Sequence, residues 1–125
     1  MIFGIGNDLA AVPRFTRLHA RHGERTLEKL LSPAERDEFR HSSHPGSFLA
    51  KHFAAKEALA KALGIGVRHP VLLPAITVGH DALGKPVFRY SGELAAWMTE
   101  RRLHAHLSLS DENDLVAAFV VVEQE

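Results

Sequence analysis

Three residues from two separate segments have the types and spacing to do chemistry. Asp8 follows Ile2–Asn7, an apolar, glycine-containing run that predicts a short buried strand. Glu57 and Lys61 lie one helical turn apart within residues 48–63, which predict a long helix that ends at glycines. Mg²⁺ is usually held by one or two carboxylates while water and phosphate fill the rest of its shell. Two acids and a lysine brought together could therefore hold a divalent metal over a phosphorylated substrate.

The plainer interpretation of Glu57 and Lys61 is an exposed ion pair. Such an i, i+4 pair contributes about 0.3–0.5 kcal/mol to stability. Both residues lie roughly opposite the apolar side of the helix, which carries Phe48, Ala55, Leu59, Ala62 and Leu63. Asp8 favours the metal site, because a carboxylate beside a buried strand is destabilising unless it is paired, hydrogen-bonded or metal-bound.

Composition limits the classes of protein to which the chain can belong. Its 125 residues suit one domain, expected to span residues 1–125. The formal net charge is zero, so the total charge does not indicate a nucleic-acid or membrane protein. The absence of cysteine excludes disulfides and thiolate metal sites. We find no signal peptide and no apolar run of membrane-spanning length, and therefore expect a cytoplasmic protein.

Helix signals gather in the first half of the chain and strand signals in the second. The expected helices are 13–22, 26–31, 33 to about 43 (ended by His44–Ser47), 48–63 and 93–102. The expected strands are 2–7, 76–78, 87–89, 104–110 and 115–122, with a turn at 81–86 and a hairpin turn at 111–114. Ser32 and Glu35 predict a capping box at the start of the third helix. We expect a compact α+β domain with N-terminal helices packed on a mostly antiparallel sheet.

Four segments, taken in their order, are typical of one enzyme family. They are Gly4–Leu9, Phe48–Gly66, Leu83–Pro86 and Ser108–Ser110. The second contains the string Lys-Glu-Ala-x-x-Lys-Ala-x-Gly-x-Gly, which is far more specific than a single short motif. Over nearly its whole length the chain resembles the holo-acyl-carrier-protein synthases, the short bacterial type of 4'-phosphopantetheinyl transferase.

The resemblance implies an activity, a metal site and an assembly. These enzymes move phosphopantetheine from coenzyme A to a serine of apo acyl carrier protein in fatty acid biosynthesis, and release adenosine 3',5'-bisphosphate. Asp8 and Glu57 match the family's Mg²⁺ ligands, and Lys61 matches the catalytic lysine beside the phosphates. Glu57 itself or a metal-oriented water would accept the serine proton. The family also implies a homotrimer with each active site at a subunit interface.

The same resemblance implies which residues bind the two substrates. Residues at positions that match the coenzyme A site are Lys51, His52, Lys56, Lys61, Gly64, Gly84, Lys85, Pro86 and Ser110. Arg14 and Arg21 match positions at which the family docks its acidic carrier protein, and Arg17 continues the same basic stripe. Taken without the resemblance, such a stripe is typical of an ordinary solvated helix face.

Two positions depart from the commonest family pattern. Asp111-Glu112 follows Ser110 where many relatives have a histidine, which marks a subgroup and removes that histidine from the site. His52 stands where many relatives have an arginine. A phosphate contact at that position would be weaker here, or would pass to Lys51 or Lys56.

Two further motifs have plain explanations. His104 and His106 share one face of an expected strand, as two zinc ligands would, but no third ligand is evident nearby. We interpret them as the polar face of the strand. Gly4-Ile5-Gly6 lacks the third glycine of a dinucleotide-binding fingerprint and indicates close backbone packing.

Two alternative functions stay open from the sequence. The nearer one is a phosphopantetheinyl transferase that serves the carrier domains of polyketide or peptide assembly lines, because carrier preference is not visible in these motifs. The other is a non-catalytic coenzyme A-binding module. That module would keep Lys56, Lys61 and Gly64 but lose the metal-binding acids, and both acids are present.

Overall fold

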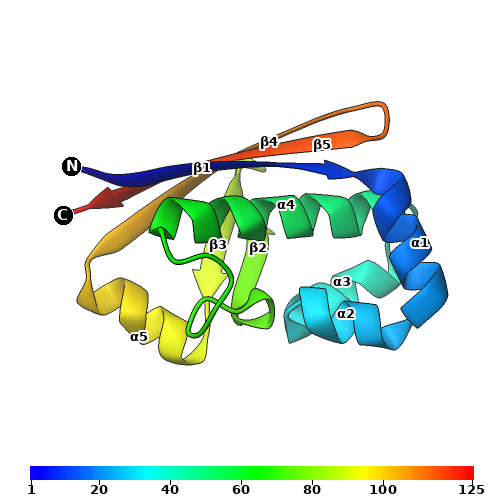
Figure 1. Ribbon diagram of the computed structural model, residues 1–125, viewed down its shortest axis with the longest axis horizontal. Coiled ribbons are helices and arrows are strands. Elements are labelled where there is room, and N and C mark those ends of the chain that lie inside the picture. The colour runs from blue at the N-terminus through cyan, green and yellow to red at the C-terminus, as the bar shows by residue number, and fades with distance from the viewer.

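A three-stranded antiparallel sheet lies across a long central helix, and the other elements pack on the far side of that helix (Figure 1). The computed structural model describes residues 1–125. Its strands are β1 (Ile2–Ala11), β2 (Ile76–His80), β3 (Pro86–Tyr90), β4 (Leu103–Glu112) and β5 (Leu115–Gln124). Its helices are α1 (Val12–His22), α2 (Glu24–Leu30), α3 (Pro33–Arg40), α4 (Pro45–Leu63), the 3₁₀ turn η1 (Leu73–Ala75) and α5 (Gly92–Glu100).

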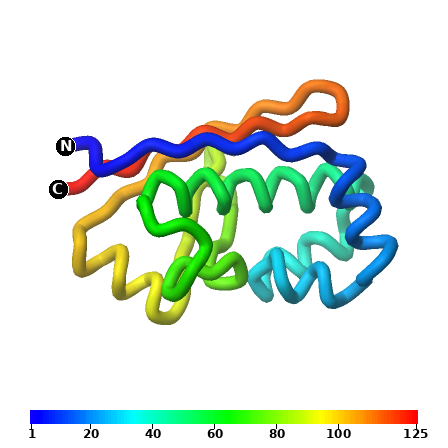
Figure 2. Tube along the Cα trace, in the orientation of Figure 1, coloured from blue at the N-terminus to red at the C-terminus, as the bar shows by residue number.

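The main sheet joins the two ends of the chain. Its strand order is β1-β5-β4 with both pairs antiparallel, and Figure 2 shows the two termini side by side. Because side chains alternate along a strand, β5 turns one face to α4 and the other outward. The buried face of β5 consists of Val116, Ala118, Val120 and Val122. The outward face leaves Leu115 and Phe119 exposed.

Two glycines of β1 let the strand lie directly on α4. A Cβ atom at Gly6 would stand 2.1 Å from the carbonyl oxygen of Ala58, and one at Gly4 would stand 1.9 Å from that of Ala62. Real Cβ atoms do not approach an oxygen so closely, so only glycine fits at either position. The close packing expected of Gly4-Ile5-Gly6 is confirmed.

Helix α4 is the centre of the fold. The sheet covers one side of it, while α1, α2 and α3 lie at one end of the opposite side and the β2–β3 hairpin and α5 fill the rest (Figure 1). One apolar cluster runs through all these elements, including Phe15, Leu59, Ile76, Leu94 and Val120. No helix of the chain is both long enough and apolar enough to cross a membrane.

The expected α+β architecture is confirmed, and several helix boundaries are corrected. The capping box is present, since Ser32 N donates to Glu35 Oε1 at 2.9 Å and Glu35 N donates to Ser32 Oγ at 3.4 Å. Helix α4 begins at Pro45 and not at residue 48, because a proline in the first turn starts a helix as readily as it ends one. Helix α5 stops at Glu100, two residues early, because Arg102 adopts a positive φ of 55°.

The sheet differs from the expected one in two ways. β1 runs to Ala11, so Asp8 lies inside a strand and not just beyond its end. The N-terminal strand is paired with the C-terminal β5, whereas β2 and β3 form a separate two-stranded sheet. Alternating apolar residues predict that strands exist, but they do not predict which strands pair.

Candidate active site

Asp8 presents a carboxylate with one paired and one unpaired oxygen. The even-numbered residues of β1 face α4, and the Asp8 side chain is accordingly only 15% exposed. Its Oδ1 lies 3.2 Å from Lys61 Nζ, which also donates to the carbonyl oxygen of Asn7 at 2.9 Å. Its Oδ2 is buried without any hydrogen-bond partner. A buried carboxylate oxygen is normally satisfied, so this one is available to accept a cation or a water.

Glu57 projects from α4 towards the same place. Partial burial raises the pKa of Glu57, and the negative charge of Asp8 raises it further, while the cations of Lys61 and Arg14 oppose the shift. The two carboxylates are therefore close enough to repel each other. The expected i, i+4 ion pair with Lys61 does not form, because Lys61 reaches across to Asp8 instead.

Asp8, Glu57 and Lys61 form what we call the β1-edge group, which fits a hard divalent cation. The repulsion between two carboxylates and the unpaired Oδ2 of Asp8 would both be relieved by a bound cation. The chain offers no cluster of three or more histidine, cysteine, aspartate or glutamate side chains. Water and phosphate would therefore complete the coordination shell, which is how Mg²⁺ is usually held.

A second group of residues lines a cleft at the other edge of the sheet. We call it the β4-edge cleft, and its lining is Lys51, His80, Lys85, Pro86 and 107–111. Lys51 Nζ lies 3.1 Å from Asp111 Oδ2, so the acid that follows Ser110 holds this lysine at the cleft. Four of the residues expected to bind coenzyme A meet here: Lys51, Lys85, Pro86 and Ser110. Sequence reasoning missed His80, whose only signal is its place just before the turn.

That turn also holds Gly84. The Asp81 carboxylate accepts hydrogen bonds from the backbone N–H groups of Leu83 and Lys85, both at 2.9 Å. Gly84 has a φ of +86°, a conformation that favours glycine. The turn therefore fixes where Lys85 and Pro86 enter the cleft.

Two of the residues expected to bind coenzyme A are buried away from both groups. Lys56 has no exposed surface, and its ammonium donates to Leu30 O, Glu35 Oε1 and Leu73 O at 2.5–2.9 Å. His52 stacks on Phe48, and its Nδ1 contacts the Phe48 carbonyl oxygen at 2.8 Å. Neither side chain can reach a phosphate from these positions, and the structure does not support either assignment. Nothing in the local sequence shows that Glu35 draws Lys56 inward.

The β1-edge group and the β4-edge cleft lie on opposite edges of one sheet. Asp8 pairs with Ala118 across β1 and β5, and Ala118 pairs with Leu109 across β5 and β4. Two strand spacings, about 10 Å, therefore separate the two edges, with α4 beneath them. Gly64, the left-handed residue that ends α4, lies thirteen residues from Lys51, or about 20 Å along the helix. One chain does not bring all the predicted residues together.

The basic stripe of α1 adjoins the β1-edge group. Arg14, Arg17 and Arg21 line a shallow surface with Leu18. The Arg14 guanidinium lies over the ring of Phe53, 5.4 Å from its centroid, and its charge opposes the rise in the pKa of Glu57.

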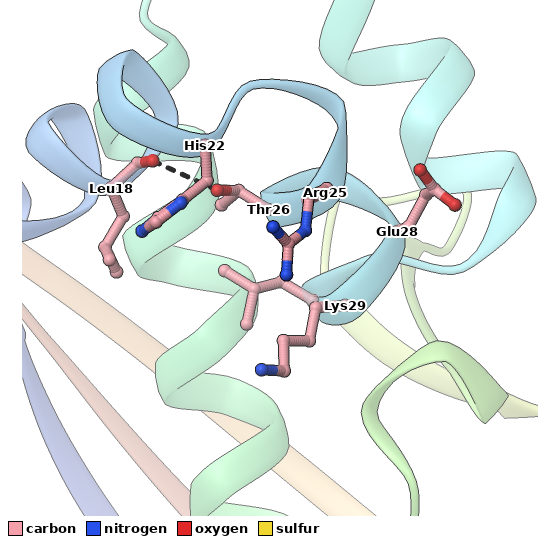
Figure 3. Close-up of a pocket in the computed structure, with 7 residues that line it drawn as sticks. Leu18, His22, Arg25, Thr26, Glu28 and Lys29 are labelled. Atoms are coloured by element: carbon pink, nitrogen blue, oxygen red, sulfur yellow. Dashed lines mark hydrogen bonds between the residues drawn. The ribbon is translucent and has the colours of Figure 1, made fainter.

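A cleft between α1 and α2 extends the basic surface (Figure 3). Thr26 Oγ1 donates to the Leu18 carbonyl oxygen at 3.1 Å and closes one side of it. His22, Arg25 and Lys29 add polar and cationic groups at its rim. Sequence reasoning missed these residues, because they continue the stripe of α1 across a helix boundary.

The two histidines of β4 contact carboxylates of β5 and the C-terminal residue. His106 Nε2 lies 2.6 Å from Glu123 Oε1, and His104 is bonded to Glu125. Both pairs lie on the outward face of the sheet, as expected of the polar face of a strand.

Comparison with known proteins gives one consistent result. Residues 4–120 match the ACPS model of the 4'-phosphopantetheinyl transferase superfamily. Holo-[acyl-carrier-protein] synthases from Laribacter hongkongensis and Azoarcus sp. are 57% and 54% identical to the chain; the alignments cover 98% of this chain and 99% and 98% of those proteins.

The fold is similar to those of solved holo-[acyl-carrier-protein] synthases. The holo-[acyl-carrier-protein] synthase of Neisseria meningitidis is 46% identical with a TM-score of 0.95, covering 99% of this chain and 100% of that one. The enzyme of Bacillus anthracis in complex with CoA (3',5'-ADP) is 31% identical with a TM-score of 0.83, covering 100% and 99%.

Proposed function

Since the chain belongs to the holo-[acyl-carrier-protein] synthases of the 4'-phosphopantetheinyl transferase superfamily, we propose that its β1-edge group is the centre of phosphopantetheine transfer. The enzyme transfers phosphopantetheine from coenzyme A to apo acyl carrier protein, a step of fatty acid biosynthesis. It is therefore a catalyst and not a bare coenzyme A-binding module. The observation that carries the assignment is the unpaired, buried Oδ2 of Asp8 beside the repelled carboxylate of Glu57.

Asp8 and Glu57 would hold Mg²⁺ in this proposal. When bound, the cation supplies positive charge against the pyrophosphate of coenzyme A and the charge that grows on its leaving phosphate. Lys61 adds a second positive charge at the same place and stabilises the leaving group. Its ammonium is anchored by Asn7 O and Asp8 Oδ1, yet its side chain is 52% exposed, so it can reach a bound phosphate. Glu57, or a water that it orients, accepts the proton of the carrier serine.

The β4-edge cleft is the proposed site for the nucleotide end of coenzyme A. Lys51 and Lys85 offer positive charge to phosphates, Ser110 offers a hydroxyl, and Pro86 offers apolar surface. The Bacillus anthracis relative was solved with CoA (3',5'-ADP) bound. Gly84 and Gly64 stay proposed coenzyme A-binding residues, and Lys56 and His52 are left out.

We further propose a homotrimer in which neighbouring chains complete each site. The outward face of the sheet exposes large apolar side chains that another chain would cover: Phe3, Ile5, Leu9, Leu115 and Phe119. A trimer that brings the β1 edge of one chain to the β4 edge of the next would join the two half-sites. A cytoplasmic location is proposed with this function.

The carrier would dock on the basic surface of α1 and α2. Arg14 and Arg21 are the proposed contacts, and the cleft bordered by Arg25 and Lys29 extends the surface that acidic residues of the carrier can engage. Because Arg14 lies near both Phe53 and Glu57, docking there would bring the carrier serine close to the β1-edge group.

One assay tests the proposed centre. The protein is incubated with coenzyme A, Mg²⁺ and apo acyl carrier protein, and the carrier is then weighed by mass spectrometry. We expect a gain of one phosphopantetheine per carrier, lost on chelation and in Asp8→Ala, which should keep its circular dichroism spectrum. An active Asp8→Ala would overturn the assignment of the centre. Carrier domains from polyketide and peptide assembly lines, assayed in parallel, measure carrier preference.

A further inference from the structure

A buried ion pair joins α4 to α3, on another face of α4 from the proposed centre, and has no part in the proposed chemistry. Lys56 and Glu35 are both fully buried, with Lys56 Nζ 2.5 Å from Glu35 Oε1. The other two N–H bonds of the ammonium go to Leu30 O at 2.8 Å and Leu73 O at 2.9 Å. An ammonium has three donors, so Lys56 is completely satisfied by this chain alone.

Both carboxylate oxygens of Glu35 also accept hydrogen bonds within this chain. Its Oε1 also accepts from Ser32 N at 2.9 Å, and its Oε2 accepts from Val78 N at 2.7 Å. The pair therefore ties α4 to the end of α2, the start of α3, the turn η1 and the strand β2. These elements lie in the layer that packs on α4 opposite the sheet (Figure 1).

Apart from this pair, much of the packing surface of α4 is made of small side chains. Its buried alanines are Ala50, Ala54, Ala55, Ala58, Ala60 and Ala62. Helices lock against neighbours when ridges of side chains enter grooves, and alanine rows form low ridges. On the sheet side, Gly4 and Gly6 meet the backbone of α4 directly, which sets its distance from β1.

We propose that Glu35 and Lys56 are a positioning pair that fixes the rotation of α4, so that Glu57 and Lys61 face Asp8. The inference rests on the proposed function of the β1-edge group. Successive residues of a helix project about 100° apart, so an anchor at Lys56 determines the direction of its neighbour Glu57. A misplacement of about 1 Å at a reacting centre can lower the rate about 10²-fold.

Stability alone does not account for such a pair. Removing two charges from water carries a desolvation penalty that can exceed their attraction, so a buried ion pair is weak evidence for stabilisation. A geometric role is different, because it depends on the length of the two side chains and not on charge alone. Variants that separate length from charge therefore test the proposal.

The experiment compares Glu35→Asp with Glu35→Gln. Glu35→Asp keeps the charge but shortens the anchor by one methylene, whereas Glu35→Gln keeps the length and one acceptor oxygen, loses the charge and replaces the other acceptor by an NH2 group. The Tm of each variant is measured first, and its Mn²⁺ affinity is measured by electron paramagnetic resonance. The kcat and the KM of carrier are then measured at a temperature below the Tm of the less stable variant. Lys56→Arg, which keeps charge and changes length, replaces Glu35→Asp if that variant does not fold.

We expect the length change to weaken Mn²⁺ binding about tenfold and to lower kcat about 10–100-fold, with the KM of carrier unchanged. Glu35→Gln should lower Tm but retain Mn²⁺ affinity and kcat. Thr77→Val is the control, because it removes the bond from Thr77 Oγ1 to Ser32 Oγ (2.7 Å) beside the network without touching α4. It should lower Tm only.

The proposal is overturned if Glu35→Asp keeps both Mn²⁺ affinity and kcat, or if losses follow Tm across all variants. Asp8→Ala is titrated in the same series. Equal Mn²⁺ binding by wild type and Asp8→Ala would refute the metal site itself, and kcat would then still decide whether the pair positions Lys61.

Discussion

At the scale of single residues, the charge of Glu57 lowers stability at a position proposed to bind the metal. Burial raises its pKa above the ordinary value of 4.5, and the nearby Asp8 carboxylate raises it further. The folded chain therefore holds this proton more tightly than the unfolded chain does. Where the folded state binds more protons, stability falls as pH rises. In the metal-free protein, the contribution of Glu57 is thus lost as pH rises through its raised pKa.

Replacing Glu57 by glutamine should remove this penalty. We expect Glu57→Gln to raise the Tm of the metal-free protein near neutral pH, and the gain should vanish below the ordinary pKa of 4.5, where the wild-type side chain is protonated in both states. Excess Mg²⁺ should raise the Tm of the wild type and not that of the variant, because a ligand stabilises only the state that binds it. Thermal scans over pH, with chelator or Mg²⁺, measure both effects. A gain in Tm that does not depend on pH would contradict the repulsion.

Lys61 gives the second prediction at this scale. A half-exposed ion pair contributes little to stability, so Lys61→Ala should have a Tm close to that of the wild type. Loss of a positive charge directed at a transition state typically raises the barrier by about 2.7–4 kcal/mol. We therefore expect kcat to fall roughly 10²-fold, with a smaller change in coenzyme A affinity.

Arg40→Ala is the matched control for Lys61. Arg40 is also about half exposed and pairs with Glu24, far along the chain from the β1-edge group. It should leave kcat unchanged. If Lys61→Ala kept normal turnover, Lys61 would only form a surface ion pair. The metal alone would then stabilise the leaving group.

At the scale of elements, local signals predicted what each segment becomes. Ser32 and Glu35 predict the capping box, and the glycines of β1 predict the close packing on α4. Local signals do not predict contacts between residues that are distant in the sequence. The burial of Lys56 depends on Glu35, twenty-one residues earlier, so its family string suggested a phosphate ligand. The two ends of the chain are joined by a pairing of β1 with β5 that no local pattern contains.

The candidate site was predicted unevenly for the same reason. Asp8 and Lys61 form an ion pair, and burial and the charge of Asp8 raise the pKa of Glu57. The strand and helix that carry these residues have strong signals in the sequence. The metal and the roles of these residues remain proposals. The split of the other residues between two sheet edges follows from strand order, which sequence periodicity does not determine.

Helix α1 carries the prediction about the carrier. Arg14→Glu combined with Arg21→Glu should raise the KM of carrier much more than that of coenzyme A, because the proposed partner is acidic. Added salt should weaken carrier binding by the wild type, since exposed charges are screened over about 8–10 Å. Steady-state kinetics with each substrate varied in turn measure both values.

A control with equal charge change tests whether α1 itself matters. Arg68→Glu combined with Arg101→Glu reverses two exposed arginines elsewhere in the chain. This variant should keep the KM of carrier near that of the wild type. Equal effects of the two double variants would show a general charge effect and no docking surface on α1.

At the scale of the whole molecule, two observations point to the same assembly. The outward face of the sheet is apolar and exposed on β1 and β5, and the two half-sites lie on opposite edges of that sheet. A cyclic trimer has one kind of heterologous interface, which can bring the two different edges together three times. Assembly of the trimer would then both cover the apolar face and complete the site.

Complementation between two inactive variants tests that assembly directly. Asp8→Ala destroys the β1-edge group, and Lys51→Ala with Lys85→Ala destroys the β4-edge cleft, so homotrimers of either should be inactive. In trimers co-expressed at equal levels, about a quarter of the interfaces would join an intact group to an intact cleft. We expect about a quarter of wild-type turnover per chain, and none after Phe119→Glu is added to both variants to break the apolar face. If each site lay within one chain, every chain would still carry a defect and no activity would return.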